Sequence, residues 1–173
     1  MRASISTFFF LRGVETVAGF ATRLGKADDA ARYSALAAAT LAAFSSRLFN
    51  ASIGLYEDGL PVSQVLALEL GLAPAGVGEA LVAQLESGVG GRIARGFRPA
   101  GGIVFMRYAF DVLARLGRND AAIQTLLAMG YPSVDAWVEM APQGPGGGGA
   151  TTLWERWEET IEETFGSKNH ISA

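Results

Sequence analysis

The sequence predicts an all-α protein made of antiparallel helical hairpins, and three observations support this fold class. Apolar residues recur every three or four positions along most of the chain, as on the buried face of a helix. No run shows the sustained alternation of a half-buried strand. The connections between the expected helices also resemble one another, which is typical of helix pairs stacked in a solenoid or toroid.

The apolar spacing places six main helices, with ends expected to hold within about 2–4 residues. We expect helices over residues 7–24, 28–49, 61–70, 75–87, 102–116 and 120–129. The apolar residues at helical spacing are Tyr33, Leu36, Ala37, Leu41, Phe44 and Leu48 in the second helix, Val77, Leu81 and Leu85 in the fourth, Phe105, Ala109, Val112, Leu113 and Leu116 in the fifth, and Ile123, Leu126 and Leu127 in the sixth. Each of these sets is expected to form a buried face.

The turns between these helices repeat the same residue types. Gly25 and Gly117 each follow Arg-Leu and suit the left-handed conformation that ends a helix. Asp28 and Asp120 then open the next helix, with their negative charge at its positive end. Gly71 closes a third helix in the same way. The repetition predicts a stack of similar hairpins.

Three segments interrupt the helical pattern within what we predict to be one domain, residues 1–173. Residues 50–61 and 88–102 are expected to be long loops, and residues 141–149 are a glycine-rich insert. Long loops at one end of a helical barrel are where functional residues usually lie.

Composition excludes several functional classes. The net charge of −3 and the pI of about 5.2 provide no basic surface for nucleic acid. The chain has no cysteine and one histidine, His170, which rules out thiolate and multi-histidine metal sites. A serine triad would have to use His170, and no Gly-x-Ser-x-Gly elbow accompanies it. No metal and no cofactor are therefore expected.

The sequence also predicts no membrane partner. The start "MRASISTFFFLRGVE" imitates a signal peptide, but Arg12 and Glu15 interrupt its apolar block. No stretch approaches the roughly 18 apolar residues of a membrane span. A soluble chain is expected, and the compartment stays open.

The stretch "GATTLWERWEE", residues 149–159, carries the main candidates for chemistry. Trp154 and Trp157 lie three residues apart, so on a helix they share one face. An apolar wall beside Glu155 would raise the pKa of its carboxyl group and suit it to acid or base work. The alternative is a packed helix start in which Glu155 is solvated and paired with Arg156. These residues alone leave both interpretations open.

Other polar residues are weaker candidates. Four glutamates between residues 158 and 163 are typical of a solvated helix face, and His170 follows them after a Gly-Ser turn. Gln64, near a helix start, is interpreted as a solvated side chain. Arg92, Arg95 and Arg98 could grip an anion, although loop arginines are usually just solvated.

The whole pattern resembles the C-terminal half of the six-hairpin catalytic domain of bacterial-type α-L-rhamnosidases. "GATTLWERWEE" resembles that family's Gly-Ala-Thr-Thr-Leu/Ile-Trp-Glu-x-Trp segment, and "GLYEDGLPVSQVLALELGLAP" resembles its loop and following helix, including Gln64. "GGIVFMRYAFDVLARLGRNDAAIQTLLAMGYPS" and "GSKNHIS" follow in the family's order. The resemblance runs from about Thr7 to Ile171. It implies part of an (α/α)6 toroid.

The resemblance also implies a function. The family hydrolyses terminal α-L-rhamnose from glycosides and polysaccharides with inversion, using one carboxylic acid and one carboxylate base. Glu155 matches the general base and His170 matches a histidine that holds the sugar. Trp154 and Trp157 would shape the pocket around the methyl group and C–H faces of rhamnose.

The chain departs from the family pattern in ways that leave its enzymatic status open. Nothing in it matches the acidic Asp-x-x-x-Arg-x-Glu segment that carries the general acid, and "PQGPGGGG" and "VDAW" are altered. We therefore expect a truncated or incomplete catalytic domain, whose exposed toroid edge predicts marginal stability or self-association. The alternative is a non-catalytic helical-hairpin module, either a carbohydrate-binding remnant or an interaction module.

Overall fold

The computed structural model describes residues 2–87 and 102–129, and in these ranges the chain is a set of helices joined by short turns. The helices are α1 (Ala3–Arg23), α2 (Ala27–Leu48), α3 (Pro61–Glu69), α4 (Val77–Ser87), α5 (Gly102–Arg115) and α6 (Asn119–Leu127). Two short strands, β1 (Phe49–Asn50) and β2 (Leu55–Tyr56), lie between α2 and α3. The predicted all-α class is confirmed, and no observed helix end differs by more than four residues from the predicted one.

The three predicted glycine turns adopt one common geometry. Gly25, Gly71 and Gly117 have φ angles of 68°, 69° and 73°, in the left-handed region that favours glycine. In each turn the residue after the glycine donates its N–H to a carbonyl five residues back, with N···O distances between 2.8 and 3.0 Å. Asp28 and Asp120 lie in the first turns of α2 and α6. The hairpin predictions drawn from these turns are confirmed.

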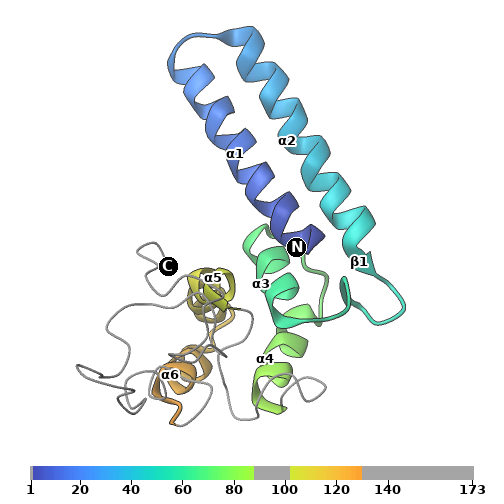
Figure 1. Ribbon diagram of the computed structural model, residues 1–173, viewed down its shortest axis with the longest axis vertical. Coiled ribbons are helices and arrows are strands. Elements are labelled where there is room, and N and C mark those ends of the chain that lie inside the picture. The colour runs from blue at the N-terminus through green and yellow to red at the C-terminus, as the bar shows by residue number, and fades with distance from the viewer. Residues whose placement is uncertain (1, 88–101, 130–173) are drawn as a thin grey trace, which may run out of the picture.

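Helix α3 lies at the centre of the described fold. Its residues from Pro61 to Ala67 are all buried. It contacts α1, α4, α5 and β2, and Figure 1 shows it between the long α1–α2 hairpin and the remaining helices. The faces predicted for α4 and α5 are confirmed at Val77, Leu81, Leu85, Phe105, Ala109, Val112 and Leu113, which are buried. Leu116, also predicted for the buried face of the fifth helix, is exposed, so this part of the prediction is wrong.

The buried face predicted for α2 is wrong in part, and the one predicted for α6 is wrong entirely. In α2 only Phe44 is fully buried, and Leu36 is exposed. In α6 all three predicted residues, Ile123, Leu126 and Leu127, are exposed, whereas Ala121 and Thr125 are buried. Both helices pack mainly against one other helix, α2 on α1 and α6 on α5. A single neighbour covers only a narrow stripe of a helix, so the wider apolar sets predicted for α2 and α6 are not covered.

The expected loop at 50–61 contains a small antiparallel β-ribbon. Phe49 pairs with Tyr56 and Asn50 pairs with Leu55. The Tyr56 ring is buried between the rings of Phe44 and Phe49, and its hydroxyl donates a hydrogen bond of 2.8 Å to the Leu72 carbonyl. Two-residue strands are too short to show alternation, so the periodicity could not reveal them. None of the helices in the described ranges is long and apolar enough to cross a membrane.

Candidate functional site

The predicted catalytic centre lies outside the described residues. Trp154, Glu155, Trp157 and His170 belong to the segment after residue 129, and Arg92, Arg95 and Arg98 belong to residues 88–101. Their roles remain predictions. The described polar site is a group of five side chains, here called the Glu57 cluster: Arg2, Ser4, Glu57, Asp58 and Ser63. It joins the start of α1 to the turn between β2 and α3.

Glu57 is the centre of this cluster and receives hydrogen bonds from both helices. Ser4 donates its backbone N–H to one carboxylate oxygen at 3.0 Å and its hydroxyl to the other at 2.7 Å. Ser63, in the first turn of α3, donates its hydroxyl at 2.6 Å. Only 14% of the Glu57 side chain is exposed, so these bonds replace most of its hydration. Glu57 thereby binds an otherwise unpaired N–H at the N-terminus of α1.

The backbone at Glu57 adopts a conformation that its residue type disfavours. Its φ angle of 53° lies in the left-handed region, and among the described residues it is the one non-glycine there. Such a conformation costs on the order of 1 kcal/mol or more for a residue with a Cβ. The hydrogen bonds from Ser4 and Ser63 hold the carboxylate in place and offset this cost.

Opposing effects act on the charge of Glu57. Burial works to raise the pKa of the Glu57 carboxyl, but the hydrogen bonds from Ser63 and Ser4 and the charge of Arg2 outweigh it and hold the pKa below its ordinary value. Arg2 also forms two hydrogen bonds with Asp58, of 2.6 and 2.8 Å, and these lower the pKa of Asp58. Both carboxylates are therefore ionised at neutral pH.

This arrangement suits a structural clamp rather than an acid or base catalyst. A general acid or base needs a pKa near the working pH and a free position for the proton that it moves. Glu57 has a lowered pKa, and both of its oxygens are already hydrogen-bonded to protein donors. The cluster fixes the base of the α1–α2 hairpin to α3.

Gln64 completes the attachment of the β-ribbon and corrects one prediction. Its amide oxygen accepts the Tyr56 N–H at 2.9 Å, and its amide nitrogen donates to the Tyr56 carbonyl at 3.0 Å. The side chain is fully buried, so its interpretation as a solvated residue is wrong. Gln64 pairs with the backbone of β2 as a neighbouring strand would.

A second ionic contact joins three helices near the other end of α3. Glu69 is paired with Arg12 of α1 at 3.3 Å and with Arg115 of α5. Arg12 and Arg115 are 39% and 54% exposed, against 28% for Arg2, so this contact is worth less than the Glu57 cluster.

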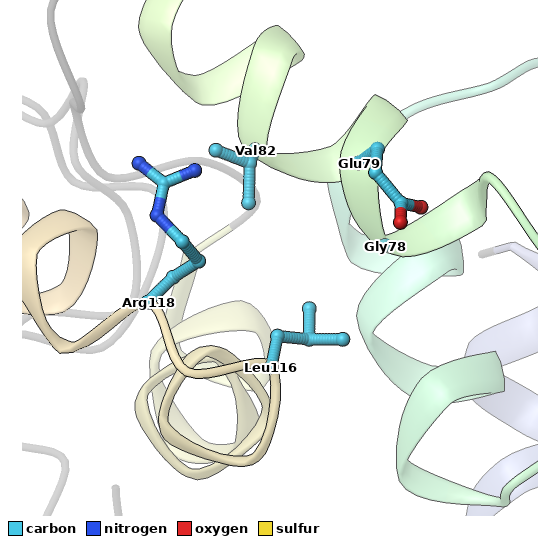
Figure 2. A pocket seen from close by; sticks show the side chains of 5 residues that line it. All are labelled: Gly78, Glu79, Val82, Leu116 and Arg118. Atoms are coloured by element: carbon cyan, nitrogen blue, oxygen red, sulfur yellow. The ribbon is translucent and has the colours of Figure 1, made fainter.

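Figure 2 shows a small pocket of about 120 Å³ between α4 and the turn from α5 to α6. Gly78, Glu79 and Val82 line one side, and Leu116 and Arg118 line the other. Arg118 already forms two hydrogen bonds of 2.9 Å with Asp120, so its positive charge is paired with that carboxylate. No group of acidic or histidine side chains that could hold a metal ion occurs in the described ranges.

Sequence reasoning did not identify the Glu57 cluster. The signals available were the adjacent acids in "YEDG" and Pro61, which suits the first turn of a helix. Neither signal indicates that the acids meet Ser4, which lies 53 residues earlier. Only the packing of α1 on α3 brings these residues together.

Comparison with known proteins identifies the family that this chain resembles. The model of the bacterial alpha-L-rhamnosidase 6 hairpin glycosidase domain matches residues 1–173. The α-L-rhamnosidase of Dictyoglumus thermophilum is 32% identical, with a TM-score of 0.72 over 95% of this chain and 18% of that one. The Streptomyces avermitilis α-L-rhamnosidase, solved with L-rhamnose, is 26% identical, with a TM-score of 0.72 over 98% of this chain and 16% of that one.

A third structure agrees in fold. The α-L-rhamnosidase of Aspergillus terreus is 20% identical, with a TM-score of 0.68 over 89% of this chain and 17% of that one. Comparison with curated proteins gives no match. The chain thus spans less than a fifth of the length of these three structures. Since the domain model matches the chain from end to end, the chain belongs to the bacterial α-L-rhamnosidase six-hairpin glycosidase family.

Proposed function

We propose that this chain forms the part of an inverting α-L-rhamnosidase catalytic domain that carries the general base, Glu155. The observation that supports this most directly is the family match over residues 1–173, which includes "GATTLWERWEE". The substrate is a terminal α-L-rhamnose on a glycoside or polysaccharide. A relative at 26% identity was solved with L-rhamnose, which supports this choice of sugar.

The chemistry needs two carboxyl groups on opposite faces of the sugar. Glu155 takes a proton from a water molecule as that water attacks the anomeric carbon, while a carboxylic acid protonates the departing oxygen. The glycosidic bond breaks as the new C–O bond forms, and the configuration inverts. In the family the general acid lies in an acidic segment, and nothing in this chain matches that segment. The chain therefore contributes the general base to the reaction and not the general acid.

The other proposed site residues bind the sugar. Trp154 and Trp157, three residues apart in the sequence, would provide apolar walls for the methyl group and C–H faces of rhamnose. The walls would also exclude water other than the attacking molecule. His170 would hydrogen-bond the sugar hydroxyl groups, since its two ring nitrogens can donate and accept.

A substrate that needs no acid tests the base directly. Dinitrophenol leaves without protonation, so this chain should hydrolyse dinitrophenyl α-L-rhamnoside but not an alkyl rhamnoside. Glu155→Gln should remove about 10²–10⁴-fold of that activity while largely sparing sugar binding. The matched control is Glu158→Gln, three residues further along the same acidic segment. Unchanged turnover in Glu155→Gln would exclude Glu155 as the base.

Two further readouts separate the parts of the proposal. NMR of the first product formed should show the β-anomer of L-rhamnose, as inversion requires. Tryptophan fluorescence should respond to L-rhamnose more than to L-mannose. The two sugars differ only at C6, which is a methyl group in rhamnose and carries a hydroxyl group in mannose. Equal responses to both sugars would contradict an apolar pocket for the methyl group.

A second candidate function is a non-catalytic module, and the unmatched acid segment favours it. Rhamnose binding without turnover of the dinitrophenyl substrate would indicate a carbohydrate-binding remnant. No sugar binding, together with a defined protein partner, would indicate an interaction module. In either case the family's helical hairpins would serve as a scaffold. We also propose self-association through the exposed edge of an incomplete toroid.

A further inference from the structure

We draw no further inference here: the strongest candidate, the exposed apolar face of α1 formed by Phe10, Val17, Phe20 and Leu24, carries nothing because no feature of the part of the chain that the structure describes shows what covers it.

Discussion

Helices α2 and α3 differ in how much of each the rest of the protein covers. Helix α2 is 22 residues long and buries one residue completely, Phe44. Helix α3 is nine residues long and buries seven, from Pro61 to Ala67. Figure 1 shows the reason: over most of its length α2 lies beside α1, whereas α3 is surrounded by other elements.

The difference shows that helix length does not measure a helix's contribution to stability. Most helical stability in proteins comes from tertiary packing rather than from helix propensity. Helix α3 thus carries more of the described core than α2 does, although it is less than half as long. The α1–α2 hairpin depends on its contacts at α3, and the Glu57 cluster is the strongest of the polar ones.

The largest effect expected from this comparison is Leu66→Ala, in the fully buried part of α3. Leu66 belongs to the buried core cluster, so removing its side chain leaves a cavity inside that cluster. We expect a loss of about 2–5 kcal/mol in the free energy of unfolding, measured by urea denaturation. Leu36→Ala in the exposed face of α2 should cost less than about 1 kcal/mol. Similar losses of unfolding free energy at Leu66 and Leu36 would contradict the difference drawn between α3 and α2.

A smaller effect is expected where the two regions join. Glu57→Gln removes the negative charge that pairs with Arg2 and weakens the hydrogen bonds from Ser4 and Ser63. We expect a loss of about 1–3 kcal/mol, together with faster amide hydrogen exchange in the first turns of α1. Glu86→Gln, an exposed residue of α4, is the matched control. Unchanged exchange in α1 would show that the cluster does not hold the hairpin.

The pH dependence of the same variant sharpens this prediction. The pKa of Glu57 is lowered by folding from an ordinary value of 4.5, so the folded state favours the ionised form. Its stabilising contribution is fully present above about pH 4.5 and is lost as the pH falls through the folded pKa. The difference in stability between the wild type and Glu57→Gln should therefore be constant near neutral pH and shrink in acid. A constant difference down to strong acid would contradict the assignment.

The smallest effect expected is a gain. Gly19 lies in the middle of α1, where a Cβ would meet nothing within 4 Å. Gly19→Ala should stabilise the protein by about 0.5–1 kcal/mol, because alanine loses less backbone freedom in a helix. The gain should appear as a rise in melting temperature. A loss of stability would mean that this face of α1 is covered.

Local signals in the sequence account for much of the described fold. Gly25, Gly71 and Gly117 ended helices as predicted, because a left-handed turn needs a glycine and leaves a mark in the sequence. Leu36 and Leu127 are apolar at helical spacing and yet exposed. Periodicity shows that a helix has an apolar face, but it does not show how many neighbours will cover that face.

The polar sites were harder to predict than the helices. In the sequence Gln64 resembles a surface residue. Its side chain is buried because it pairs with the backbone N–H and C=O of Tyr56 in β2, and no periodicity reveals this contact. Glu57 depends on Ser4, far away in the chain. The predicted centre at Glu155 rests on a family motif, so it is independent of both.

The hydrogen bonds around β2 and α3 carry a consequence for the order of folding. Gln64 with Tyr56, Glu57 with Ser63 and Tyr56 with Leu72 are separated by 8, 6 and 16 residues, whereas Ser4 and Glu57 are separated by 53. Closing a 53-residue loop costs about 1.7 kcal/mol more in chain entropy than closing one of 8. Residues 56–72 can therefore assemble as a local nucleus, and α1 joins a surface that is already formed.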